Sequence, residues 1–160
     1  MHRLTPTTDN GLSASACKTV HFPLVTLCML RIGTCCLMRM VANNVRPAMI
    51  LTRAGHWFTI TSLTGVFTTT TRFRLNDERY APTHDGRRVA RVFTLEGSTL
   101  TCVERGHKLV TTVFHFTAEE LKMTIMVDDV VCTRIFEAIR GMELEGFMSA
   151  PHQAPHIGKK

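Results

Sequence analysis

The chain has 160 residues and a formal net charge of +6, from 19 Lys and Arg against 13 Asp and Glu. Hydrophobic residues make up 44% and charged residues 20%, which excludes an intrinsically disordered chain and a multi-span membrane protein. This length predicts one compact domain with tails. The basic charge favours an anionic partner, but it does not choose among nucleic acid, an acidic membrane face and a small anionic ligand.

The residues that most often carry catalysis or metal binding show no pattern for either. The six cysteines form no CxxC pair, and several lie in apolar runs where a free thiol behaves as a small hydrophobe. The eight histidines lack metal-ligand spacing, and the chain has neither a nucleophile–base motif nor a glycine-rich phosphate loop. The sequence therefore predicts reduced thiols, no metal, no cofactor and no enzymatic activity.

One apolar run, Val20 to Leu30, needs a separate interpretation. It is shorter than the roughly 20 apolar residues of a spanning helix. Pro23 interrupts it, and no A-x-A cleavage pattern follows Arg31. We therefore expect neither a transmembrane segment nor secretion.

The middle of the chain has the pattern of a β-meander. From Gly55 to Asp129, turn-forming residues recur every ten residues or so. Over Phe67–Asn76, apolar residues and threonines alternate with a second set that includes Arg72 and Arg74, so one strand face is cationic. Closure of such strands into an up-and-down antiparallel barrel would remove exposed edges. Upstream, Ile32–Asn44 has few strand signals and predicts a short amphipathic helix.

Beyond this pattern, five segments resemble the intracellular lipid-binding protein family, which includes fatty acid-binding and cellular retinoid-binding proteins. They follow the family order over about 90 residues: RPAMILTRAG (Arg46–Gly55), TSLTGVFTTT (61–70), THDGRRV (Thr83–Val89), VFTLEGSTL (Val92–Leu100) and DDVVCTRIF (Asp128–Phe136). The resemblance implies an all-β, calycin-like fold: a ten-stranded up-and-down barrel with a short helical lid and the ligand inside.

The resemblance ends upstream, because the family's opening strand and first lid helix are not visible. We expect a divergent N-terminal segment over 1–31, disordered or replacing the first strand, a lipid-binding barrel over 32–140 and a flexible tail over 141–160. Ala16–Phe22 is long enough to serve as the first strand, and Leu24–Met40 as lid material. Without a first strand, two barrel strands would keep unpaired edges.

The resemblance also implies a carboxylate site, made by an Arg-x-Tyr pair on the last strand and a second Arg near the third-last. Arg134 stands at the first position, and a guanidinium inside a barrel suits a carboxylate through two parallel hydrogen bonds. Phe136 replaces the Tyr, which removes a hydroxyl donor worth roughly 1 kcal/mol. His115 aligns with the second Arg, and Phe114 is the alternative occupant if the turn is one residue shorter. A satisfied barrel-wall histidine is an equally good interpretation of His115.

The remaining site positions are implied ligand-lining residues of the wall and portal, for each of which ordinary core packing is an equal alternative. They are Pro47, Ile60, Ser62, Val66, Thr83 and Asp85. Val66 stands where many fatty acid-binding members place a portal Phe. Since each buried methylene contributes about 0.8 kcal/mol, an acyl chain would supply more affinity than its headgroup.

These observations predict a monomeric, non-enzymatic carrier of a long-chain fatty acid or similar hydrophobic carboxylate, located in the cytoplasm, with the nucleus as an additional alternative. A retinoid carrier is the nearest alternative, because DDVVCTRI resembles the cellular retinoic acid-binding proteins. A poorly folded chain without a carrier function is a further alternative, and nucleic acid is not expected because aromatic and basic residues do not interleave. A different class is a basic membrane-surface protein, docking on anionic lipid through Arg72, Arg74, Arg87, Arg88 and Arg91, although a solvated face is the simpler interpretation.

Overall fold

The computed structural model describes residues 13–21, 29–33, 47–64, 68–83 and 86–139, with 13–21 described by their backbone. Within these residues the chain forms ten strands and one short helical turn at residues 29–31. The strands are β1 (Ser13–His21), β2 (Ala48–Ala54), β3 (Trp57–Leu63), β4 (Thr68–Phe73), β5 (Arg79–Pro82), β6 (Arg88–Glu96), β7 (Thr99–Arg105), β8 (Leu109–Phe116), β9 (Glu120–Val127) and β10 (Val130–Ala138).

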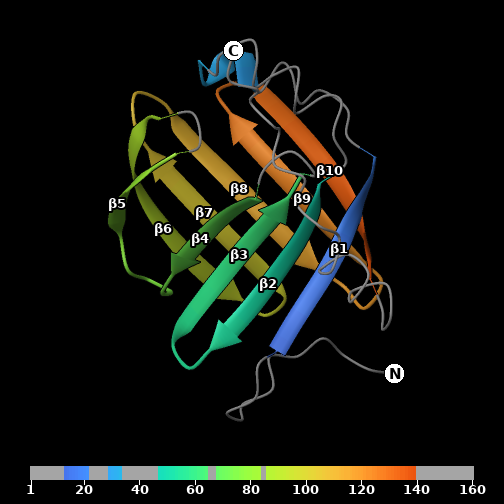
Figure 1. Cartoon of the computed structure of the whole chain (residues 1–160). Coiled ribbons are helices and arrows are strands. Elements are labelled where there is room, and N and C mark those ends of the chain that lie inside the picture. The colour runs from blue at the N-terminus through green and yellow to red at the C-terminus, as the bar shows by residue number, and fades with distance from the viewer. Residues whose placement is uncertain (1–12, 22–28, 34–46, 65–67, 84–85, 140–160) are drawn as a thin grey trace, which may run out of the picture.

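All ten strands belong to one antiparallel sheet in the order β4-β3-β2-β1-β10-β9-β8-β7-β6-β5. The sheet curls so that β2, β3 and β4 lie in front of the strands from β6 to β9 (Figure 1). Most neighbours in the sheet are also neighbours in the chain, as a meander requires, and the predicted all-β, up-and-down architecture is confirmed. β4 and β5 are the two ends of this order, and no ladder between them is found among the described residues.

The N-terminal segment contributes the first strand. β1 pairs with β2 on one side, where Lys18 faces Ala48, and with β10 on the other, where Lys18 faces Glu137. The strand begins at Ser13, three residues before the stretch expected from length, and an irregularity between Thr19 and His21 shifts its register with β10. β1 therefore joins two strands that would otherwise expose edges.

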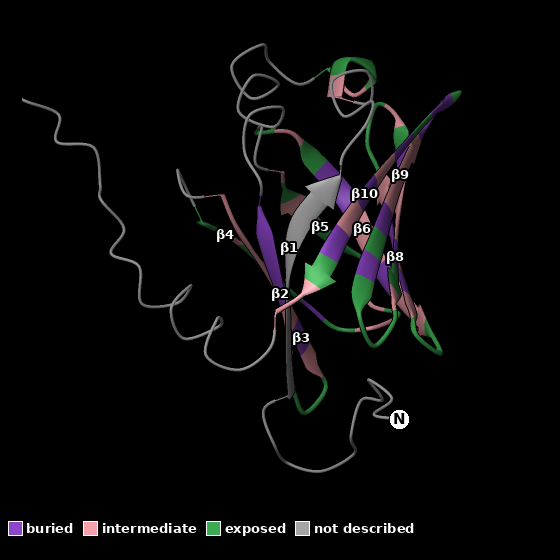
Figure 2. Cartoon of the chain, turned by 90° about the vertical axis from the view of Figure 1, so that its right-hand side faces the viewer, coloured by how far each residue is buried: buried purple, intermediate pink, exposed green. Residues whose placement is uncertain are grey.

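Alternating side chains place the core on the inner face of the curled sheet. β10 shows this most clearly, because Val130, Cys132, Arg134 and Phe136 are buried while Val131 and Glu137 are exposed. The same alternation produces the purple and green bands of Figure 2. The main inner cluster includes Met49, Phe58, Phe73, Phe93, Leu100, Cys102, Phe114, Leu121, Met123 and Phe136.

Aromatic side chains connect β4, at one end of the sheet, to β6 near the other end. The ring centroids of Phe58 and Phe73 are 5.6 Å apart, and those of Phe73 and Phe93 are 3.6 Å apart, both stacked. Leu75, just beyond β4, forms an isolated bridge with Phe93, and the Asn76 amide donates to the Phe93 carbonyl at 2.8 Å. These contacts link β4 to β6 where the hydrogen-bonded ladder stops.

Two further sequence expectations fall partly outside the described residues. The helix predicted over Ile32–Asn44 and the lid material over Leu24–Met40 are described only for residues 29–33, where a single helical turn ends at Gly33. Of the six cysteines, Cys102 and Cys132 have described side chains, and both are buried free thiols. In the part of the chain that is described, no helix has the length and apolar character needed to cross a membrane.

Candidate functional site

Arg134 lies on the inner face of β10, between Cys132 and Phe136 in the alternating pattern. Arg134 is only 9% exposed to solvent, which is unusual for arginine. Burial lowers the pKa of the Arg134 guanidinium below its ordinary value, and the nearby Cys132 acts in the opposite direction. The group therefore occupies an environment in which an anion would offset the loss of hydration.

The strand register surrounds Arg134 with apolar side chains. Arg134 faces Met123 on β9, Met123 faces Phe114 on β8, and Phe114 faces Leu100 on β7. Met123, Phe114 and Leu100 are all buried. A guanidinium in such a row can bind a carboxylate bidentately, because its planar donors match the two carboxylate oxygens.

Phe136 follows Arg134 on the same inner face and is 0% exposed. It faces Leu121 across the β9 ladder and belongs to the main inner cluster. The structure thus brings Arg134 and Phe136 to the same side of the sheet. A phenyl ring supplies packing at this position and no hydrogen-bond donor.

His115 does not face this interior. Its side chain is exposed, and its Nδ1 lies 3.1 Å from the Oγ1 of Thr99 on the outer face. Phe114, the alternative occupant, is the inward residue, because adjacent side chains of a strand point to opposite faces. The expectation of a ligand contact at His115 is therefore corrected, and the barrel-wall interpretation describes it better.

The expected wall positions fall into three groups. Pro47 is buried, and Ile60 and Ser62 share the inner side of β3 with the core residue Phe58. Thr83 instead closes a turn, since its amide and its Oγ1 both donate to the Arg87 carbonyl at 2.7 and 3.1 Å. The last two positions, Val66 and Asp85, lie outside the described residues.

The structure adds an interior ion pair that the sequence did not indicate. Arg91 on β6 and Glu104 on β7 face each other across the ladder, and both are largely buried, with side-chain exposures of 14% and 18%. Arg91 shares its face with Phe93 and was expected on the surface, so that expectation is corrected. The alternation of side chains along β6, with the apolar Phe93 two positions after Arg91, was the signal in the sequence that could have placed Arg91 on the inner face.

Cys102 lies beside this pair on the inner face of β7, two residues before Glu104. Burial and, to a smaller extent, the Glu104 carboxylate raise the pKa of its thiol from 9.0 to about 12, against the opposing effect of Arg91. Such a thiol stays protonated at neutral pH. It is therefore a packing residue rather than a nucleophile.

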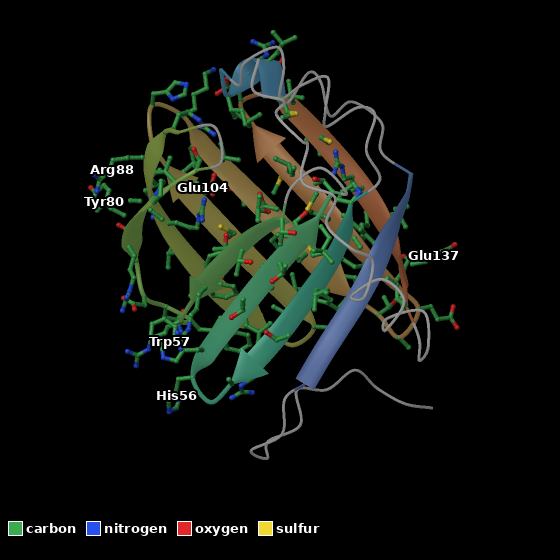
Figure 3. The ribbon with its side chains drawn as sticks, in the orientation of Figure 1. His56, Trp57, Tyr80, Arg88, Glu104 and Glu137 are labelled. Carbon is green, nitrogen blue, oxygen red and sulfur yellow. The ribbon has the colours of Figure 1, made fainter. Side chains whose placement is uncertain are left out.

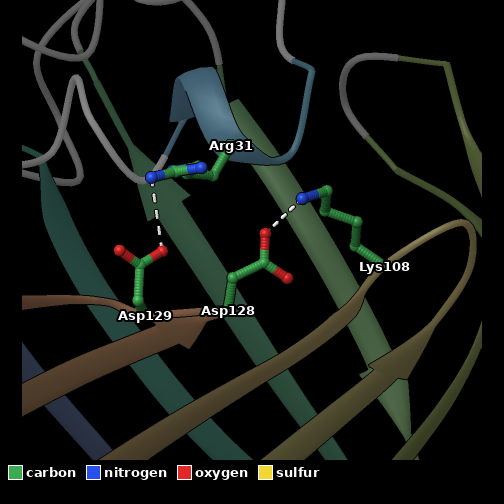
Figure 4. A network of polar contacts seen from close by, with 4 residues as sticks. All are labelled: Arg31, Lys108, Asp128 and Asp129. Carbon is green, nitrogen blue, oxygen red and sulfur yellow. Dashed lines mark hydrogen bonds and ion pairs between the residues drawn. The ribbon is translucent and has the colours of Figure 1, made fainter.

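The helical turn at residues 29–31 is connected to the end of the β9–β10 hairpin. Arg31 forms an ion pair with Asp129 at 3.3 Å, and Lys108 pairs with the neighbouring Asp128 (Figure 4). Beneath them, Met29 and Ile32 pack against a second buried cluster that includes Val127. This contact covers one end of the inner face.

No group of three or more His, Cys, Asp and Glu side chains able to hold a metal ion is found in the described part of the chain. The interior instead offers buried guanidinium groups and apolar surface. Its chemistry suits binding of a hydrophobic anion.

Comparisons with known proteins agree with this geometry. The chain is 32% identical over 114 residues to fatty acid-binding protein homolog 1 of Echinococcus granulosus, an alignment that covers 69% of this chain and 85% of the relative. It is 33% identical over 85 residues to the muscle fatty acid-binding protein of Schistocerca gregaria, covering 52% and 63%. No family model matches the chain.

Solved structures give the same result at the level of the fold. The fatty acid-binding protein from brain tissue of Drosophila melanogaster superposes with a TM-score of 0.74 at 30% identity, over 76% of this chain and 95% of that protein. A Schistosoma mansoni fatty acid-binding protein in complex with arachidonic acid superposes with a TM-score of 0.75 over 78% of this chain and 94% of that protein. Its identity is 22%, so this second likeness concerns the fold alone.

Proposed function

Because the chain belongs to the fatty acid-binding protein family, we propose that it is a non-enzymatic intracellular carrier of a long-chain fatty acid. The ligand's carboxylate binds the Arg134 guanidinium, and its acyl chain lies against the apolar inner face of the sheet. The single observation that carries this proposal is a charged guanidinium, 9% exposed, in a row of buried apolar side chains.

Two kinds of contact would hold the ligand: polar contacts to its carboxylate and apolar contacts to its acyl chain. A carboxylate gives Arg134 two charge-assisted hydrogen bonds in a poorly hydrated environment, where such bonds are strong. The inner side chains, which include Met49, Phe58 and Leu121, offer the hydrocarbon contact. Because the buried side chains of Phe136 and Phe114 offer no hydrogen-bond donor, the carboxylate depends mainly on Arg134.

Retinoic acid is the alternative ligand, since it also pairs a carboxylate with a long apolar body. The relatives named above favour the fatty acid, because both are named for fatty acid binding. Displacement of a bound fluorescent fatty acid by each of the two ligands ranks their affinities directly.

The test is displacement of an environment-sensitive fluorescent fatty acid from the purified full chain by oleate and by retinoic acid. Arg134→Met keeps a flexible, unbranched apolar stem and removes the charge and the hydrogen-bond donors. Arg88→Met is the matched control, because Arg88 is exposed and projects outward from β6 (Figure 3). Circular dichroism first establishes that all three proteins are β-rich.

We expect saturable one-to-one binding by the wild type and by Arg88→Met, with oleate displacing the probe more strongly than retinoic acid. Arg134→Met should lose about tenfold or more in affinity, the value of hydrogen bonds to a charged group. A β-rich wild type that binds neither ligand would overturn the proposal. Equal affinities for wild type and Arg134→Met would remove Arg134 from the site.

A further inference from the structure

Three guanidinium groups gather around one indole ring on the outer surface of the sheet. The guanidinium carbons of Arg72, Arg79 and Arg74 lie 4.4, 5.5 and 5.6 Å from the centroid of the Trp57 ring. Each distance is within the range of a cation–π interaction. We call these four residues the Trp57 cluster. The ring holds together cations that would otherwise repel one another.

The Trp57 cluster retains a net positive charge. Asp77 pairs with Arg79, with its Oδ2 2.8 Å from Nε and 2.7 Å from Nη2. Among the described residues, neither Arg72 nor Arg74 forms an ion pair with a carboxylate. All three arginines are exposed, so two guanidinium charges face the solvent beside the indole.

The outer face of β3 and β4, next to the cluster, carries no opposing charge. β3 has the sequence WFTITSL and β4 has TTTTRF, so neither strand contains Asp or Glu. Thr61 and Thr70 meet across the two strands, with their hydroxyl oxygens 3.5 Å apart. A basic, aromatic corner thus continues into a neutral, hydroxyl-bearing face that an anionic surface can approach without repulsion.

The cluster is also well separated in the fold from the helical turn at residues 29–31. Trp57 and His56 lie at the lower end of the sheet in Figure 3, beside the β2–β3 turn, whereas the helical turn lies at the upper end. The cluster is therefore a surface feature distinct from Arg134 and from the covered end of the interior.

We propose that the Trp57 cluster and the adjoining outer face of β3 and β4 form a docking surface for anionic phospholipid bilayers. Guanidinium groups bind phosphate oxygens through paired hydrogen bonds. An indole ring partitions to the headgroup level of a membrane, where its apolar body and N–H group are both accommodated. An anionic bilayer supplies many phosphates in one plane, which matches the several arginines that surround the Trp57 ring on the outer surface of the sheet.

The chain provides its own reporter, because Trp57 is its only tryptophan. Intrinsic emission and vesicle sedimentation are measured with phosphatidylcholine vesicles containing phosphatidylserine, and with vesicles of phosphatidylcholine alone. The double variant Arg72→Gln and Arg74→Gln removes two cluster charges. The control variant Arg88→Gln and Lys122→Gln removes the same formal charge from two exposed cations outside the cluster.

We expect a blue shift of Trp57 emission and cosedimentation with the anionic vesicles, both weakening as salt is added. Brominated lipid in the same vesicles should quench Trp57. The cluster variant should lose about fivefold in affinity for each arginine removed. The control variant should stay close to the wild type.

Four results would overturn the assignment. Equal losses in both double variants would show that only total charge matters, and sedimentation without quenching would place another surface on the membrane. Tighter binding to duplex DNA than to vesicles would assign the cluster to nucleic acid. Saturation by glycerophosphoserine at vesicle-equivalent concentration would make it a site for a small anion. None of these outcomes depends on whether Arg134 binds a fatty acid.

Discussion

Inside the barrel, the Nε of Arg91 donates a hydrogen bond to Oε1 of Glu104 at 2.7 Å, and its Nη2 forms an ion pair with the same oxygen at 2.5 Å. The two residues are cross-strand partners on β6 and β7, and their inner-face neighbours Phe93, Leu100 and Cys102 are buried. The pair therefore adds a neutralised polar site to an inner face that also carries Arg134.

Removing the charge of Glu104 should destabilise the fold. Glu104→Gln keeps the side-chain shape but leaves the Arg91 charge without its carboxylate, at a cost of about 2 kcal/mol. Replacing both residues, with Arg91→Met and Glu104→Leu, should recover part of this loss because no buried charge remains. Urea unfolding of the three proteins measures the free energies.

The neighbouring residue gives the control for that comparison. Arg105 pairs with Glu78 at 2.5 Å, but both side chains are about half exposed, at 54% and 50%. Glu78→Gln should therefore change the free energy of unfolding by less than about 1 kcal/mol. Equal losses in Glu78→Gln and Glu104→Gln would contradict the view that burial sets the cost of breaking these pairs.

The Cys102 thiol makes the stability depend on pH in alkaline solution. Its folded-state pKa is raised from 9.0 to about 12, so above pH 9 the unfolded chain releases a proton that the folded chain retains. The contribution of the protonated Cys102 thiol to the free energy of unfolding is fully present below pH 9. It should fall by about 1.4 kcal/mol per pH unit as the pH rises from 9 toward 12.

Comparison with Cys102→Ala isolates this effect from the other titrating groups. The free energy of unfolding of the wild type minus that of the variant should shrink as the pH rises from neutral to about 10.5. Urea unfolding at each pH measures the difference. A difference that stays constant with pH would mean that the thiol is hydrated in the folded protein.

Much of the fold could be predicted from the sequence because its signals are local. Regular turn residues and alternation, as in Leu121–Val127, are set by strand geometry and predicted the antiparallel barrel. The position of β1 was less accessible. Ser13–His21 carries a weak pattern, and its place between β2 and β10 depends on partners far along the chain.

The site was harder to predict because it depends on register. A slip of one residue in a turn next to β8 exchanges Phe114 and His115 between the two faces, because adjacent side chains of a strand point to opposite faces. Arg91 looks like the other arginines of its segment until its partner Glu104, 13 positions away in sequence, is placed opposite it. Arg134 was assigned inward from the resemblance, and the alternation of β10 places it there.

Phe114 and His115 therefore provide a direct test of the β8 register. Phe114→Ala should destabilise the protein by about 3 to 5 kcal/mol, because it leaves a space among buried side chains. His115→Ala should change stability by less than about 0.5 kcal/mol and leave ligand affinity unchanged, because its side chain is exposed. Thermal unfolding and probe displacement measure both effects. A loss of affinity in His115→Ala with normal stability would restore it to the site.

Phe136→Tyr should strengthen ligand binding while weakening the ligand-free protein. Phe136 and Arg134 lie two positions apart on the inner face, about 7 Å along the strand, so a new hydroxyl can reach a carboxylate held at Arg134. The added hydrogen bond should improve affinity about fivefold. Without ligand, the hydroxyl is buried beside apolar groups and should cost about 1 to 3 kcal/mol of stability.

The measurement is the melting temperature with and without oleate, together with the dissociation constant from probe displacement. Phe93→Tyr is the matched control, because it adds the same hydroxyl to the aromatic stack on β6. It should lose stability with no gain in affinity, since it lies on a different strand from Arg134. If Phe136→Tyr gains no affinity, or if Phe93→Tyr gains as much, the carboxylate is not held beside β10.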